Sequence, residues 1–260
     1  MLEEQSPIGI GEVISETFEF IGDRAATVFG VAFLVILPER LLIIYLATHG
    51  VFQNVTSGSL GNYGLALLAI SALGTFMAFF GQGVLVGTAL QRRDGRQSDL
   101  LGALAAAARR LPIALPVSLL YLAGFILGFV LLVVPGIMLL TMWAVVGPVL
   151  VAERTGLFET FSRSRALTRN TRWRIFLLLL VAGIAVGGLN WLLQRLGMSV
   201  LETRSLVLSY AVEPAPFLYV TLLSTIAYGF QLAMVCTLYI VLIERRGDGP
   251  TTDRLTRIFE

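Results

Sequence analysis

Residues 111–152 read LPIALPVSLLYLAGFILGFVLLVVPGIMLLTMWAVVGPVLVA, an apolar stretch that contains no charged side chain. The hydrocarbon core of a bilayer is about 30 Å thick, and roughly 20 apolar residues in a helix cross it. The stretch therefore predicts two membrane-spanning helices, at about 111–133 and 134–152. Pro135-Gly136 leaves a very short connection between them and predicts a tight helical hairpin.

The rest of the chain contains further apolar runs of similar length, at about 25–52, 62–91, 173–194 and 216–243. Only helices are expected there, because hydrocarbon offers no partner for an unpaired backbone N–H or C=O. Charged residues make up 14% of the chain, against roughly 25% in soluble domains. We expect an all-α integral membrane protein with six spans, organised as a single polytopic domain over residues 1–260.

The distribution of arginine predicts the orientation. All 19 basic residues are arginine, and nearly all lie before the first span, in segments 92–110 and 153–174, or after residue 244. Six alternating spans place these segments on one side of the membrane, with only Arg195 and Arg204 on the other. Because arginine-rich loops stay in the cytoplasm, we expect both termini to be cytoplasmic.

The segment before each odd-numbered span has the pattern of a short amphipathic helix on the cytoplasmic membrane surface. The third of these helices is expected to end at Asn170 in the left-handed conformation. The chain then divides into units of surface helix, span and span, at about 9–91, 98–152 and 156–245. Such units are either parallel repeats or the usual polar linkers of a polytopic protein.

Three spans carry two glycines four residues apart, a spacing that lets helices approach closely. The pairs are Gly83 and Gly87, Gly124 and Gly128, and Gly183 and Gly187. The close approach is either within one chain or between protomers of a homo-oligomer.

Two charged residues, Glu39 and Arg40, follow Pro38 near the middle of the first run. Each costs about 2.5–3.5 kcal/mol at the centre of a membrane helix, so both are expected to gain from a polar partner. The expected partners on other spans are Gln82, Trp143, Asn190 and Gln231. The pair either forms an internal site for an ion, headgroup or proton, or fixes the register of the helices.

A second set of charges lies in the third cytoplasmic segment and the start of the fifth span. Its members are Arg163, Arg165, Arg169, Arg172 and Arg174. Each arginine near an anionic membrane surface contributes about 1 kcal/mol of attraction. These residues either face lipid headgroups or only set the topology, and Trp173 among them has the position of an interfacial anchor.

Groups typical of catalysis are missing from the sequence. It contains one histidine, His49, and one cysteine, Cys236. No cluster has metal-ligand spacing, and without lysine there is no phosphate-binding loop of the Gly-x-x-x-x-Gly-Lys type. We expect no cofactor, no nucleic-acid binding and no enzymatic activity.

Residues 134–174 carry a family resemblance, through short motifs in a fixed order. The residues that carry it include Pro135, Gly136, Pro148, Glu153, Ser164 and Thr168. The segment resembles the membrane domain found beside some bacterial glycerophosphodiester phosphodiesterases and in stand-alone bacterial inner-membrane proteins. Asn170 departs from the glycine expected there, and we expect no catalytic barrel beside this segment. The resemblance implies an inner-membrane module with a lipid-related role rather than phosphodiester hydrolysis.

Three functions follow as hypotheses. The first is a non-enzymatic inner-membrane protein that binds anionic lipid headgroups on the cytoplasmic side, a partner membrane protein, or both. The second is a transporter or lipid-moving protein that uses Glu39 and Arg40. The third is an accessory subunit of a larger membrane complex.

Overall fold

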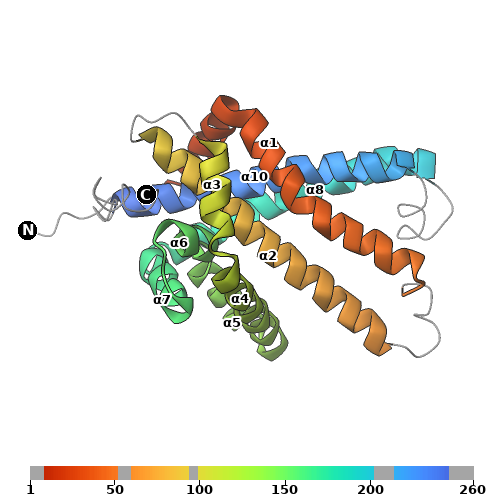
Figure 1. The fold of residues 1–260 in the computed structure, drawn as a ribbon, viewed down its shortest axis with the longest axis horizontal. Coiled ribbons are helices and arrows are strands. Elements are labelled where there is room, and N and C mark those ends of the chain that lie inside the picture. Colours follow the sequence, from red (N-terminus) through yellow and green to blue (C-terminus); the bar gives the residue numbers. More distant parts are fainter. Residues whose placement is uncertain (1–8, 52–59, 94–98, 202–213, 246–260) are drawn as a thin grey trace, which may run out of the picture.

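The computed structural model describes residues 9–51, 60–93, 99–201 and 214–245 (Figure 1). All regular structure in these ranges is α-helical, which confirms the predicted class. The helices are α1 (Ile10–Thr48), α2 (Leu60–Arg93), α3 (Leu100–Ala108), α4 (Leu111–Leu131), α5 (Val133–Met142), α6 (Val146–Ala152), α7 (Leu157–Thr168), α8 (Arg172–Leu201) and α10 (Pro214–Arg245).

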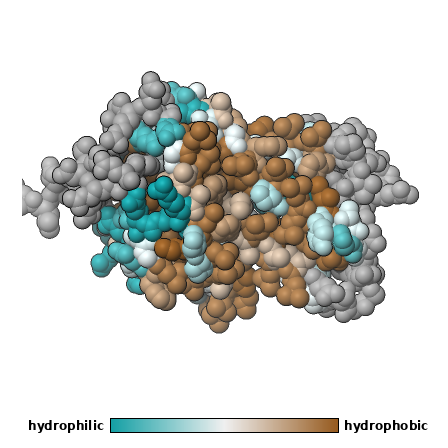
Figure 2. Space-filling model, in the orientation of Figure 1, coloured by the Kyte–Doolittle hydropathy of each residue, from teal (hydrophilic) through white to brown (hydrophobic). Residues whose placement is uncertain are grey.

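Five helical segments within the described residues are long and apolar enough to cross a membrane. They are Ile10–Thr48, Tyr63–Gln91, Leu111–Leu131, Val133–Ala152 and Phe217–Arg245. The chain is therefore a multi-pass membrane protein by length and composition. The remaining predicted span, 173–194, coincides with the 30-residue helix α8, which is not among the five. The surface in Figure 2 is broadly hydrophobic, and hydrophilic residues gather towards its left end.

The first and last helices, α1 and α10, lie antiparallel along most of their lengths. Arg245 forms an ion pair with Glu12, and the hydroxyls of Thr17 and Thr237 are 2.8 Å apart. Further along, Arg40 donates a hydrogen bond to Ser224. The beginning of α1 and the end of α10 therefore lie at the same end of the bundle.

The segment predicted as the first surface helix forms the start of α1. Its backbone leaves helical geometry at Arg24 (φ −141°, ψ 30°), which separates it from the apolar part of the helix. Val13 and Thr17 are fully buried, because this segment packs against the end of α10. The other two predicted segments match α3 and α7.

The hairpin predicted at Pro135-Gly136 is present. Leu132, in an extended conformation (φ −166°, ψ 147°), is the single residue between α4 and α5. A Cβ added to Gly128 would lie 3.0 Å from the Cα of Gly136, so the two helices meet backbone to backbone. Pro135 lies in the first turn of α5, where its missing N–H leaves no carbonyl without a donor.

The predicted single span 134–152 is interrupted between Met142 and Val146, which divides it into α5 and α6. Pro148 supplies the physical reason, because it has no N–H to offer the carbonyl of Ala144 and its ring crowds that position. The helix is thus broken one turn before the proline rather than at it.

Two of the three glycine pairs are packed inside the chain. A Cβ on Gly83 would lie 2.8 Å from the Cβ of Val151, and one on Gly87 would lie 3.3 Å from the Cβ of Ala103. A Cβ on Gly124 would overlap the ring of Trp143. By contrast, within the described structure nothing lies within 4 Å of a Cβ added to Gly183 or Gly187 in α8.

Candidate functional site

The break between α5 and α6 is held by hydroxyl groups of α7. Ser164 Oγ donates to the carbonyl of Met142, the last residue of α5, at 2.9 Å. Thr168 Oγ1 lies 3.3 Å from the same carbonyl and also donates to the carbonyl of Ser164 at 3.0 Å. A broken helix leaves its last carbonyls without intrahelical donors, so these hydroxyls satisfy Met142. Both side chains are fully buried.

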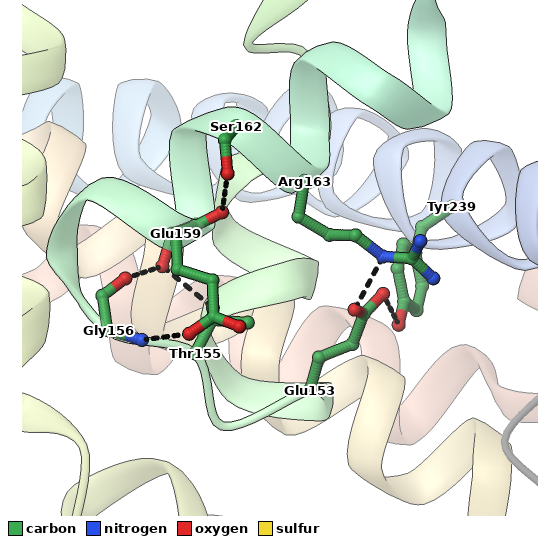
Figure 3. A network of polar contacts seen from close by, with 8 residues as sticks. Glu153, Thr155, Gly156, Glu159, Ser162, Arg163 and Tyr239 are labelled. Carbon is green, nitrogen blue, oxygen red and sulfur yellow. Dashed lines mark hydrogen bonds and ion pairs between the residues drawn. The ribbon is translucent and has the colours of Figure 1, made fainter.

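Glu153, just after α6, is the centre of a polar network that joins three parts of the bundle (Figure 3). Its Oε2 accepts a hydrogen bond from Arg163 Nε of α7 at 2.7 Å. Its Oε1 accepts one from the hydroxyl of Tyr239 in α10 at 3.3 Å. Tyr239 is only 1% exposed, so the network reaches the core.

The turn between α6 and α7 is fixed by local hydrogen bonds, also drawn in Figure 3. Gly156 N–H donates to the carboxylate of Glu159 at 3.3 Å, which is the carboxylate half of a capping box. Thr160 Oγ1 donates to the carbonyl of Gly156 at 2.7 Å and lies 2.8 Å from Thr155 Oγ1. These contacts orient the start of α7.

The prediction that Arg163 belongs to an open basic patch is corrected by the structure. Its guanidinium is engaged by Glu153 instead of forming part of an open patch, because α7 turns this side towards the loop after α6. Arg165 and Arg169 are exposed on the other side of α7, and Arg172 and Arg174 are half-buried at the start of α8.

Two large apolar side chains lie close in sequence to these arginines. Trp173 and Phe158 are each 76% exposed. Nearby, Arg110 precedes α4, where burial and the charge of Arg154 lower the pKa of its guanidinium. Arginine stays cationic at neutral pH after such a shift. Cationic and aromatic side chains therefore gather at this end of the molecule.

The charges within the first span find their partners on α10. Arg40 Nη2 donates to Ser224 Oγ at 2.7 Å, and the hydroxyl of Tyr228 donates to Glu39 Oε2 over a long 3.5 Å. Gly74 of α2 leaves room for the carboxylate, since an added Cβ would lie 3.2 Å from Glu39 Oε2. Arg40 therefore contacts α10, and Glu39 lies between α10 and α2.

Three of the four partners predicted for this pair lie elsewhere. Gln82 is eight residues beyond Gly74, about 12 Å along α2, and its Oε1 lies against Gly147 without a hydrogen-bond partner among the described residues. Trp143 packs its ring against Phe161, with centroids 4.8 Å apart. Gln231 is exposed, and the side chain of Asn190 lies outside the described structure.

Sequence reasoning missed Ser224 and Tyr228. Their spacing of four residues within an apolar run was the available signal, because residues four apart share one face of a helix. The predicted site therefore assembles in part: Glu39 and Arg40 are adjacent to polar groups, but to those of the last helix.

The described residues include no group of three or more histidine, cysteine, aspartate or glutamate side chains that could hold a metal ion. Comparison of the chain with protein-family models, curated proteins and solved structures gave no match.

Proposed function

We propose that this chain crosses a bacterial inner membrane six times with both ends in the cytoplasm. We further propose that it binds anionic phospholipid headgroups, without catalysing a reaction, through a basic surface formed by Arg165, Arg169, Arg172 and Arg174. The resemblance of residues 134–174 to lipid-related membrane modules favours the same role.

The pairing of α1 with α10 supports the even number of crossings. Glu12 and Arg245 form an ion pair, so the chain enters and leaves the bundle at the same end. A chain with this arrangement crosses the membrane an even number of times. The five segments that are long enough, together with α8, would make six.

One observation carries the lipid-binding proposal: α7 is fixed on one side and basic on the other. Ser164 and Thr168 hold its inner side to the Met142 carbonyl, while Arg165 and Arg169, four residues apart, are exposed. Trp173, 76% exposed at the start of α8, has the amphipathic ring that prefers the membrane–water interface. This arrangement would hold the arginines at the depth of the lipid headgroups.

The test is lipid binding by the double variant Arg165→Gln/Arg169→Gln. The protein is titrated with phosphatidylglycerol in a maltoside detergent, and bound lipid is counted by native mass spectrometry. Loss of two contacts of about 1 kcal/mol each predicts roughly thirtyfold weaker binding. The control is Arg109→Gln, which removes an exposed arginine at the end of α3 and leaves the surface unchanged. Equal affinity of the double variant and the unmodified protein would contradict the proposal.

A further inference from the structure

Hydroxyl groups of α10 lie in a row beside Arg40. Ser224 accepts a hydrogen bond from its guanidinium, and Thr221 lies three residues before Ser224. Residues three or four apart lie on the same side of a helix, so Thr221, Ser224 and Thr225 share one stripe. Within this stripe, Ser224 contacts the first span at its positive charge.

Two atoms at this place have no hydrogen-bond partner among the described residues. One is Oγ1 of Thr221, whose side chain is 3% exposed, and the other is the buried Nε of Arg40. Thr225 differs, because its hydroxyl donates to the carbonyl of Thr221 at 2.8 Å. A buried polar atom without a partner costs about 1–3 kcal/mol, and proteins rarely leave one so.

The two unpaired groups can both donate a hydrogen bond to the same acceptor. The Nε–H of Arg40 is a donor only, and the hydroxyl of Thr221 can donate as well. An acceptor oxygen between Arg40 and the Thr221–Ser224 stripe would satisfy both. Since the guanidinium is permanently charged, an anionic oxygen would make a charge-assisted hydrogen bond, roughly twice as strong as a neutral one.

The neighbouring carboxylate lies towards the other end of the stripe. Glu39 Oε2 accepts from Tyr228 and lies over Gly74 of α2. Tyr228 is seven residues after Thr221, about 10 Å along the helix. Thr221 therefore lies nearer along α10 to Ser224, which contacts Arg40, than to Tyr228, which contacts Glu39. Arg40 is eight residues before the end of α1 at Thr48, about 12 Å along the helix axis.

We propose that Arg40, Thr221 and Ser224 bind the anionic oxygens of a phosphate group, supplied either by a phospholipid headgroup or by free phosphate. This site is separate from the basic surface of α7 and α8, and it lies towards the opposite end of α10 from Arg245.

The test uses two probes added separately to the protein in a maltoside detergent, which has no phosphate of its own. The probes are inorganic phosphate and phosphatidylglycerol, and native mass spectrometry counts the bound molecules. The chain carries Arg165→Gln/Arg169→Gln throughout, so that lipid held by the α7 surface does not contribute. The two proposals therefore succeed or fail independently.

The decisive variant is Thr221→Val, which keeps the shape of the side chain and removes its hydroxyl. At least one probe is expected to bind, with a tenfold or greater loss of affinity in Thr221→Val and in Arg40→Gln. Thr225→Val, the matched control, removes the hydroxyl of another buried threonine that already has an intrahelical partner, and is expected to bind normally.

Binding of phosphatidylglycerol alone would identify a lipid headgroup as the source, and binding of inorganic phosphate would identify a free anion. Three results would overturn the proposal: neither probe binds, Thr221→Val binds as well as the parent chain, or Thr225→Val loses binding to the same degree. Because Thr221→Val preserves packing, the test does not depend on whether Arg40→Gln folds.

Discussion

The same substitution, glycine to alanine, is expected to have opposite effects at Gly83 and Gly183. A Cβ at position 83 would lie 2.8 Å from the Cβ of Val151 and 3.0 Å from its Cγ1, and nearer still to Cγ2. Val151 is buried at 9% exposure, so neither α2 nor α6 can shift without repacking. Overpacking of this kind costs about 1–3 kcal/mol.

At position 183 no described atom lies within 4 Å of the added Cβ. Alanine is there expected to stabilise the helix, by up to about 1 kcal/mol from its higher propensity. The two variants should therefore differ by about 2–4 kcal/mol in free energy of unfolding, with opposite signs relative to the parent chain.

The assay is reversible unfolding in mixed micelles, with helix content followed by circular dichroism while the denaturing detergent is increased. A second substitution, Val151→Ala, removes both Cγ atoms and is expected to recover part of the loss in Gly83→Ala, although it destabilises the parent chain. That non-additivity should amount to about 0.5–3 kcal/mol. The packing of α2 on α6 described above is incorrect if Gly83→Ala unfolds at the same amount of denaturing detergent as the parent chain. It is also incorrect if the effects of Gly83→Ala and Val151→Ala on the free energy of unfolding simply add.

Two smaller changes test the polar contacts of α7 and α10 by the same unfolding measurement. Ser164→Ala removes one of the two donors to the buried Met142 carbonyl and should cost about 0.5–1.5 kcal/mol. Ser162→Ala, on the exposed side of the same helix, should be nearly neutral, and equal losses would argue against the role of Met142. Tyr239→Phe removes one hydrogen bond to Glu153 and should cost about 0.5–1.5 kcal/mol, so an unchanged midpoint would show that the hydroxyl contributes nothing.

Apolar length predicted most of the fold because the bilayer constrains each span locally. The helix expected at 111–133 is Leu111–Leu131 in the structure, and the short Pro135-Gly136 connection follows from two residues. The break at 143–145 was not predicted within the span 134–152, because no glycine or proline marks those positions and the cause, Pro148, acts on the turn before it.

The site was less predictable, because the faces that meet depend on how distant helices rotate against one another. Arg40 could have faced any span, and only the antiparallel contact of α1 with α10 selects Ser224. The left-handed end predicted at Asn170 was wrong: α7 ends at Thr168, and the capping residue Arg169 has right-handed geometry. Among the described residues other than glycine, only Arg154 has a positive φ. After α7, the amide of Thr171 donates a hydrogen bond to the carbonyl of Thr168, and the chain continues directly into α8.

The pairing of the first helix with the last has a consequence for biogenesis. Ser224 is 184 positions after Arg40, and ribosomes add roughly 5–20 residues per second. Arg40 is therefore synthesised about 10–40 s before its partner. Throughout that interval the nascent first helix carries a charge that only the insertion machinery, water or lipid can accommodate. The contact between Arg40 and Ser224 can form only after that interval.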